Sequence, residues 1–191
     1  YKVYKGDFCS KEEMQAQAED CKAEEDWSLI DTKFFSKPKI RNGVLESKGR
    51  LTVRGFNDPE GDLYRKDSPT LAKATFFLLL TMILCHGWVL GKIDVSGAFL
   101  QGEEIDRVVW LEFPKSLIDL GLVDAIRRFR RICKAVYGLN QAPRQWFLRL
   151  CAILVELDFV QSLIDGCLFH LWRDGVLVMS LGFHVDDLLL G

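Results

Sequence analysis

Two stretches of the chain are predicted to be helices. One runs from Leu71 to Gly87 and contains the most apolar segment of the chain, residues 74–85, and the other follows Pro143. Proline is tolerated in the first helical turn, so Pro143 is predicted to open the second helix. Its apolar positions repeat as one helical face requires, at Trp146, Phe147, Leu150, Cys151, Leu154 and Leu157. The segment at 74–85 is shorter than the ~20 residues that cross a membrane, which predicts a core helix and no membrane partner.

Shorter stretches show the two-residue alternation of strands. Trp88 to Val95 places apolar side chains on both faces, and residues 108–113 form a second short run. Residues 167–172 and 176–184 flank Asp174-Gly175. Because this dipeptide is a strong hairpin signal, the two flanking segments are predicted to pair.

A further turn signal, Asn42-Gly43, precedes residues 44–56, which are predicted to form a short strand pair. Helices and strands follow one another without a regular βαβα alternation. This order predicts an α+β fold in which helices pack on one face of an antiparallel sheet.

Residues 1–43 are predicted to form an acidic helical extension, which is either a solvated helix that packs lightly or a tether to an upstream region. Ser10 and Glu13 have the spacing of a capping box at a helix start. Runs of charge are usually solvated faces, and this one contains Glu12, Glu13, Glu19, Asp20, Glu24, Glu25 and Asp26. The remaining residues, 44–191, are taken as the main domain.

The composition limits the classes of protein that fit. The chain has 191 residues, 49% of them hydrophobic, and a net charge of -2, unlike a strongly basic nucleic-acid coat protein. Its six cysteines form no C-x-x-C pair, which predicts a reduced intracellular protein without a structural metal. One basic cluster spans residues 127–134. It is either a contact for a phosphate backbone or a solvated strand edge.

Three carboxylates interrupt apolar segments near the ends of predicted strands. Asp94 follows one strand, and Asp186 and Asp187 follow another. Burying unpaired carboxylates is costly, so two such places favour a cation between them. Mg²⁺ prefers carboxylate and phosphate oxygens. From spacing alone, a metal site and ordinary polar turns remain equally open.

Four motifs carry a resemblance to a known family. They are K-I-D-V-S-G-A-F-L-Q-G at residues 92–102, Y-G-L-N-Q-A-P-R-Q-W-F at 137–147, H-V-D-D at 184–187 and K-G-R-L-T-V-R-G-F at 48–56. Their sequence and order resemble the reverse transcriptase domain of Ty1/copia-type retrotransposon polyproteins. The resemblance implies the fingers and palm of a right-hand polymerase over residues 44–191, ending before a thumb.

The resemblance also implies roles for individual residues. Asp94, Asp186 and Asp187 would be catalytic and, with the carbonyl of Val95, would bind two Mg²⁺ ions, or Mn²⁺ in their place. The nucleotide-binding residues would be Lys48, Arg54, Phe99 and Gln141. Phe99 would lie under the sugar and exclude a 2′-hydroxyl, while the cations would neutralise the triphosphate. Each has a plainer alternative as a core, helix-entry or exposed strand residue.

One position departs from the family pattern. His184 stands where the family usually has tyrosine, beside the primer end, and histidine is smaller and can titrate.

The implied reaction joins a dNTP to a primer 3′-hydroxyl on an RNA or DNA template. Implied partners include the rest of a polyprotein (thumb, RNase H and integrase), in a cytoplasmic particle or the nucleus. A decayed copy that binds nucleic acid or a protein without catalysis, and a metal-dependent nuclease, remain alternatives.

Overall fold

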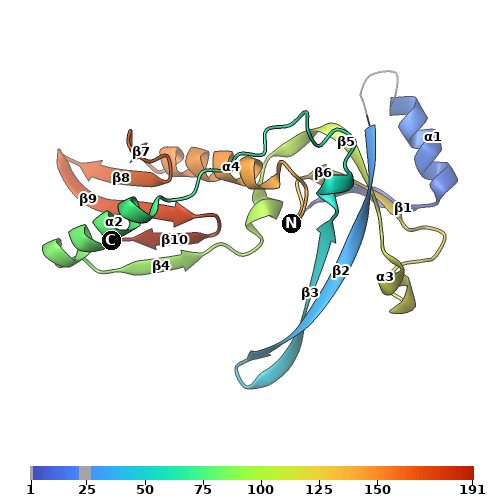
Figure 1. The fold of residues 1–191 in the computed structure, drawn as a ribbon, viewed down its shortest axis with the longest axis horizontal. Helices are drawn as coiled ribbons and strands as arrows, with labels where there is room; N and C mark the ends of the chain where they lie inside the picture. Colours follow the sequence, from blue (N-terminus) through green and yellow to red (C-terminus); the bar gives the residue numbers. More distant parts are fainter. Residues whose placement is uncertain (1, 22–26) are drawn as a thin grey trace. The chain divides into compact units, whose positions relative to one another are not determined.

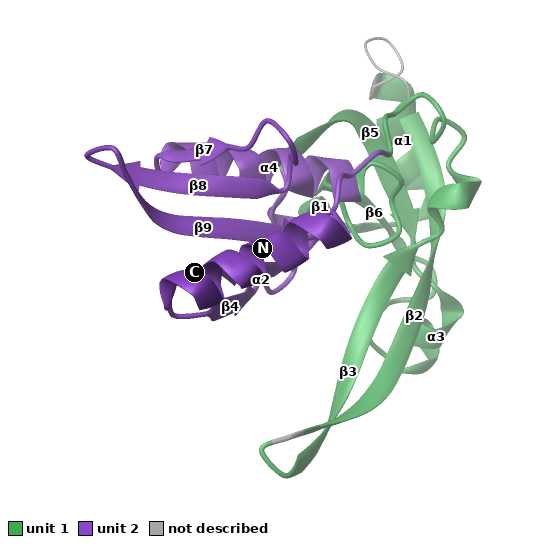
Figure 2. Cartoon of the chain, turned by 60° about the vertical axis from the view of Figure 1, so that its left-hand side comes forward, with its two compact units in different colours: residues 1–66, 103–142 green, residues 67–102, 143–191 purple. Residues whose placement is uncertain are grey.

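The computed structural model describes residues 2–21 and 27–191. The chain forms two compact units, coloured separately in Figure 2. Unit 1 comprises residues 1–66 and 103–142, and unit 2 comprises residues 67–102 and 143–191. Both contain strands and helices (Figure 1), which confirms the α+β class. Glu24, Glu25 and Asp26 of the predicted acidic run lie outside the described residues.

Unit 1 is built on a five-stranded sheet in the order β1-β6-β5-β2-β3. Its elements are β1 (Tyr4–Cys9), α1 (Lys11–Cys21), β2 (Trp27–Arg41), β3 (Val44–Val53), the 3-10 helix η1 (Gly55–Asn57), β5 (Glu104–Glu112), α3 (Lys115–Asp119) and β6 (Phe129–Lys134). The β2 and β5 strands are parallel, with Trp27 opposite Val108. The other neighbours in this sheet are antiparallel.

The strands β2 and β3 form a long hairpin that was predicted only in part. Asn42 and Gly43 take φ angles of 50° and 78° at its turn, the positive values that Asn-Gly turns adopt. The partner of residues 44–53 is β2, which lies before the turn, and not a second strand within 44–56. Residues 27–41 are therefore part of the sheet, and the helix described within the predicted extension spans residues 11–21.

Helix α1 begins with the predicted capping box. The Ser10 N–H donates to Glu13 Oε2 at 2.8 Å, and the Glu13 N–H donates to Ser10 Oγ at 3.2 Å. Met14 and Ala18 are fully buried against Val108 and Trp110 of β5. This helix therefore packs on the sheet more firmly than its charge pattern suggested.

Unit 2 contains a second five-stranded sheet, in the order β4-β10-β9-β8-β7 and antiparallel throughout. Its elements are α2 (Lys73–His86), β4 (Gly91–Asp94), the 3-10 helix η2 (Ala98–Gln101), α4 (Ala142–Glu156), β7 (Phe159–Gln161), β8 (Leu168–Arg173), β9 (Val176–His184) and β10 (Asp187–Leu190). Asp174 and Gly175 form the predicted turn between β8 and β9.

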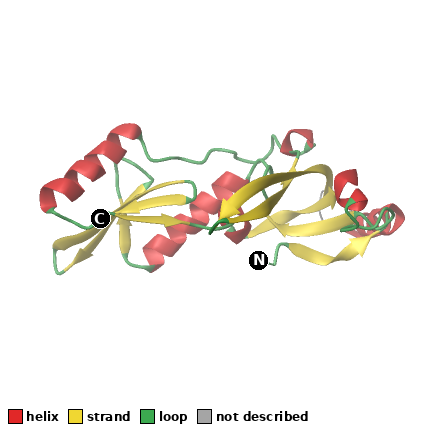
Figure 3. Ribbon diagram, turned by 90° about the horizontal axis from the view of Figure 1, so that it is seen from below, coloured by secondary structure: helices red, strands yellow, loops and turns green. Residues whose placement is uncertain are grey.

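Helices cover both faces of this second sheet (Figure 3). Alternate residues of a strand face opposite sides. Leu181 and Leu188 pack in one cluster with α4, whereas Leu168 and Leu189 pack in another with Leu79 and Ile83 of α2. The prediction that helices lie on one face is therefore wrong for unit 2, because α2 occupies the opposite face.

Helix α2 is less buried than its apolar sequence predicts. It ends at Gly87, whose φ of 64° suits a left-handed cap. Asp165 tethers its first turn by accepting the Ala72 N–H at 3.0 Å. Thr75, Leu79 and Ile83 are buried, yet Phe77 is 54% and Leu84 80% exposed. Within the described residues, no helix combines the length and apolar character that crossing a bilayer requires.

Candidate active site

The sheet of unit 2 aligns three of the predicted site residues in one row. Asp187 of β10 lies directly opposite Asp94 of β4 on one side and His184 of β9 on the other. Directly opposed residues of antiparallel strands project from the same face, with backbones about 4.5–5.5 Å apart. Asp94, Asp187 and His184 are all exposed. Two carboxylates distant in sequence thus share one solvent-accessible surface with the imidazole.

Asp186 lies in the tight turn between β9 and β10. Its backbone carbonyl accepts the Val95 N–H at 2.9 Å, which joins the turn to the end of β4. Val185, the preceding residue, has a φ of 59°. A positive φ is uncommon for a β-branched residue and marks a strained turn. The chain therefore holds Asp186 beside Asp94 and Asp187 in a backbone conformation that the sequence did not predict.

A lysine lies against the acidic row. Lys92 Nζ is 2.8 Å from Asp187 Oδ1. The hydrogen bond and charge of Asp187, with smaller contributions from Asp94 and Asp186, raise the pKa of the Lys92 ammonium. Strand alternation places residue 92 on the same face as residue 94, so the sequence carried a signal for this contact. Lys92 is therefore an exposed ion-pair partner of Asp187.

The donor set of this surface suits a hard divalent cation. Asp94 and Asp187 are paired across β4 and β10, and the backbone of Asp186 in the adjoining turn is bonded to Val95. Across residues 2–21 and 27–191, no three Asp, Glu, His or Cys side chains converge into a ready-made metal cage. Carboxylates are nevertheless the ligand type that Mg²⁺ prefers, and this ion takes part of its coordination from water and substrate phosphates.

Phe99 packs against the same hydrophobic cluster of unit 2 as Val185 of the β9–β10 turn. It belongs to η2, which follows β4 after Gly97, a residue with a φ of 65°. The ring is half-buried and packs against the cluster that contains Trp146 and Phe183. One side of the ring therefore contributes to the core, and part of it stays accessible.

Lys48 lines a basic pocket in unit 1. The pocket has a volume of about 520 Å³ and is formed by Phe35, Lys37, Lys48, Arg50 and Thr52. Lys37 is paired with Lys48 and Phe35 with Arg50 across the β2–β3 hairpin, so all four share one face. The motif resemblance named Lys48 but not Lys37 or Arg50, although two-residue alternation along each strand places them on the same face.

Arg54 and Gln141 are both engaged by their own chain. Arg54 Nη1 is 2.9 Å from Asp31 Oδ2 in a half-exposed ion pair. Gln141 is 3% exposed, and its Oε1 accepts a hydrogen bond from Arg107 Nη2 at 3.1 Å. Arg54 and Gln141 therefore each bond to another residue of the chain, and any contact with a nucleotide would come in addition to these bonds.

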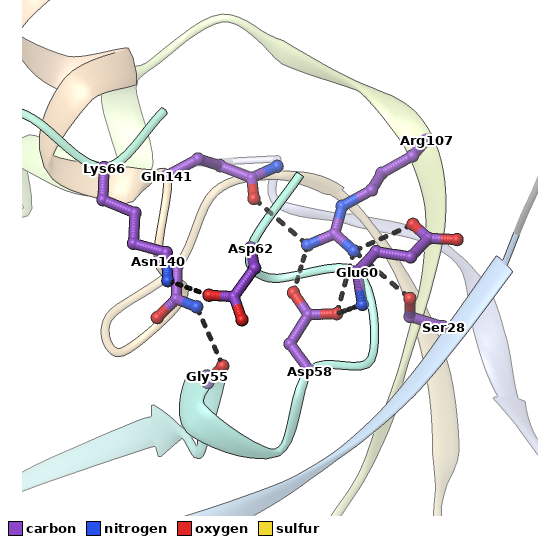
Figure 4. Close-up of polar contacts among 9 residues, drawn as sticks. All are labelled: Ser28, Gly55, Asp58, Glu60, Asp62, Lys66, Arg107, Asn140 and Gln141. Carbon is purple, nitrogen blue, oxygen red and sulfur yellow. Dashed lines mark hydrogen bonds and ion pairs between the residues drawn. The ribbon is translucent and has the colours of Figure 1, made fainter. Parts of the chain in front are cut away.

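Arg107 is the centre of a buried polar cluster that the sequence did not reveal (Figure 4). Its side chain is 3% exposed and forms a bidentate pair with Asp58, whose carboxylate is fully buried. Glu60 Oε2 lies 3.2 Å from Nη1, and the guanidinium lies 4.5 Å from the centre of the Tyr64 ring. Burial lowers the pKa of Arg107, but the bonds to Asp58 and Glu60 outweigh it and raise the pKa overall.

Two of the sequence motifs meet directly in unit 1. The Val53 N–H donates to the Tyr137 carbonyl at 2.8 Å, and Asn140 Nδ2 donates to the Gly55 carbonyl at 3.0 Å. A Cβ on Gly138 would lie 2.0 Å from the Val53 carbonyl oxygen. The glycines of both motifs are therefore required where their backbones cross, which gives them a structural role.

The basic cluster at residues 127–134 is largely used within unit 1. Arg128 Nη2 is 2.7 Å from Glu112 Oε1, and Arg127 Nε donates to the Phe8 carbonyl at 3.1 Å. Arg130 Nε donates to the Gly6 carbonyl, and its guanidinium lies 4.5 Å from the Tyr4 ring centre. These contacts favour the interpretation of a packed strand edge over a phosphate-binding surface.

The part of the chain that contains all four motifs matches a known protein family. Residues 21–191 match the family described as "Reverse transcriptase (RNA-dependent DNA polymerase)". The chain belongs to the reverse transcriptase family of copia-type retrotransposons. The match begins before residue 44, so it includes β2, which the sequence had placed outside the main domain.

The retrotransposon relatives are much longer proteins. The chain is 35% identical over 159 residues to the Retrovirus-related Pol polyprotein from transposon RE2 of Arabidopsis thaliana, covering 82% of this chain and 11% of that protein. It is 34% identical to the polyprotein from transposon RE1 of the same plant, covering 82% of the chain and 10% of the relative. It is 26% identical to the Retrovirus-related Pol polyprotein from transposon TNT 1-94 of Nicotiana tabacum, over 77% of the chain and 11% of the relative. The chain thus spans about a tenth of these relatives, and no solved structure matches it.

Proposed function

We propose that the chain is the fingers and palm of an RNA-directed DNA polymerase that adds deoxynucleotides to a primer. The observation that carries this proposal is the acidic surface of unit 2. Asp94 lies opposite Asp187 across β4 and β10, and Asp186 is bonded through its backbone to Val95. Membership of the reverse transcriptase family supports the same activity.

In this proposal the carboxylates of Asp94 and Asp186, with Asp187 and the Val95 carbonyl, hold two divalent cations. Bound Mg²⁺ or Mn²⁺ would activate the attacking hydroxyl and neutralise the leaving pyrophosphate. The backbone of β4 and β10 keeps the acids at fixed separation, so the reacting groups are oriented before the chemical step. His184, in the same row as Asp187, would contact the primer end.

Two sets of residues, one in each unit, are proposed to contact the nucleotide. Lys48, with Lys37 and Arg50 in the basic pocket, supplies cations suited to a triphosphate. Arg54 lies in the same motif as Lys48, and Gln141 lies in the motif at residues 137–147. Phe99 offers a half-buried ring that would exclude a 2′-hydroxyl. A template with its primer and a dNTP are the proposed partners, within a longer Pol polyprotein in an intracellular particle or the nucleus.

A second candidate is a decayed copy that binds nucleic acid without catalysis. The observation that favours it is His184, which occupies an exposed position next to Asp187 where the family usually has tyrosine. If this histidine is the cause, His184→Tyr should restore synthesis to an otherwise inactive protein.

Primer extension on an RNA template tests the proposal. Because the chain spans about a tenth of its relatives, residues 21–191 would replace the matching segment of the transposon RE2 polyprotein. We expect this chimera to extend the primer with Mg²⁺ and Asp186→Asn to lower the rate at least about a thousandfold, as loss of a catalytic group does.

Asp174→Asn is the matched control, because Asp174 is an exposed acid in the β8–β9 turn and asparagine tolerates its positive φ. Its rate should equal that of the parent chimera. Binding of template and primer without any extension, both before and after His184→Tyr, would contradict the polymerase proposal. Cleavage without synthesis would instead identify a nuclease.

A further inference from the structure

The turn that carries Asp186 is strained at the residue before it. Among the described residues other than glycine, a positive φ occurs at Val185 and at three Asn or Asp residues, which tolerate it better. Val185 is the first residue of a two-residue hairpin loop between His184 and Asp187, a place that favours glycine. Such strain persists only where surrounding contacts impose it.

The contact that imposes it comes from α4. Trp146 is 2% exposed, and its indole Nε1–H donates to the Val185 carbonyl at 2.7 Å. The next carbonyl, that of Asp186, accepts the Val95 N–H at 2.9 Å. Both peptide groups that flank the Asp186 side chain are therefore fixed, one by a buried indole and one by the end of β4.

We propose that Trp146 is a positioning residue for Asp186. Its indole N–H holds the Val185 carbonyl in the strained turn and so presents the Asp186 carboxylate to the cation. Without this bond, Val185 can relax toward a negative φ, which rotates the peptide group next to Asp186. This inference rests on the proposed metal site, and it gives the tryptophan of the Y-G-L-N-Q-A-P-R-Q-W segment a role beyond the core.

The experiment removes one hydrogen-bond donor and keeps the ring. Trp146 is replaced by benzothienylalanine, which has sulfur where indole has N–H, and Mn²⁺ affinity of the full chain is measured from the electron paramagnetic resonance signal of free Mn²⁺. We expect an affinity about tenfold lower, the scale on which outer-shell supports of a metal site act. The same replacement at Trp110 is the control, because that indole is buried and its Nε1 has no hydrogen-bond partner among the described residues.

A second variant separates positioning from packing. Val185→Gly removes the conformational strain, since glycine adopts a positive φ without cost. Added to the Trp146 replacement, it should recover most of the lost Mn²⁺ affinity, which a packing defect would not allow. Thermal unfolding of all variants checks that the chain remains folded.

The outcomes separate this inference from the proposed function. Unchanged Mn²⁺ affinity after the Trp146 replacement, in a chain whose affinity does fall in Asp94→Asn, overturns the positioning role and leaves the metal site in place. Equal affinity of the wild type and Asp94→Asn overturns the metal site, and the positioning role with it.

Discussion

Replacing Arg107 with methionine is expected to lower the free energy of unfolding by about 3–5 kcal/mol, as removal of one partner from a buried ion pair does. Methionine keeps much of the volume but leaves the Asp58 carboxylate, which is fully buried, without its bidentate partner. Ser28 and Gln141 also lose the donor that each accepts from. Urea unfolding followed by circular dichroism measures the effect.

Two further variants show whether the loss comes from the charge. Arg173→Met removes an arginine from an exposed pair with Asp158, in which the side chains are 53% and 70% exposed, and should cost at most about 1 kcal/mol. Asp58→Asn in the Arg107→Met background removes the uncompensated charge and should recover part of the stability. A loss no larger than that of Arg173→Met would contradict the structural role of the cluster.

Gly138→Ala is expected to be comparably damaging. The φ of Gly138 is 90°, and an added Cβ would lie 2.0 Å from the Val53 carbonyl oxygen and 2.7 Å from Thr52 Cγ2. Conformational strain costs about 1–3 kcal/mol, and overpacking typically adds about 1–3 kcal/mol. Since the obstructing oxygen belongs to the backbone, β3 must shift away from residues 137–140. The midpoint of urea unfolding should fall accordingly.

Gly121→Ala isolates the conformational part of this cost. Gly121 lies in the same unit with a φ of 68°, and nothing lies within 4 Å of its added Cβ. Alanine there should cost about 1–2 kcal/mol for the left-handed backbone alone. If Gly138→Ala and Gly121→Ala destabilise the chain equally, the close crossing of the two motifs does not exist in solution.

Local features of the fold could be predicted because local chemistry determines them. The Ser10–Glu13 capping box, Gly87 and the Asn42-Gly43 and Asp174-Gly175 turns all formed where the residue types require them. Pairing between distant segments could not be predicted. The parallel contact of β2 with β5 joins residue 27 to residue 108, and nothing in the alternation of either strand specifies that partner.

The residues of the candidate site were likewise predictable only in part from the sequence. Motif resemblance identified Asp94 and Asp187, which the sheet places opposite one another. Arg107 was missed because one arginine in a polar stretch carries no signal of burial until its partners, distant in sequence, are known. Val185 was missed for a different reason: its positive φ opposes the preference of valine, so propensity predicts another conformation.

Paramagnetic broadening can show whether Asp94 and Asp186 form a divalent-cation site. Mn²⁺ would be titrated into ¹⁵N-labelled chain while amide resonances are recorded, an assay that needs neither catalysis nor the rest of a polyprotein. We predict that amides at residues 94–95 and 185–187 broaden first, and that the double variant Asp94→Asn, Asp186→Asn abolishes this. Broadening that starts elsewhere, or that persists in the double variant, would contradict a divalent-cation site at Asp94 and Asp186.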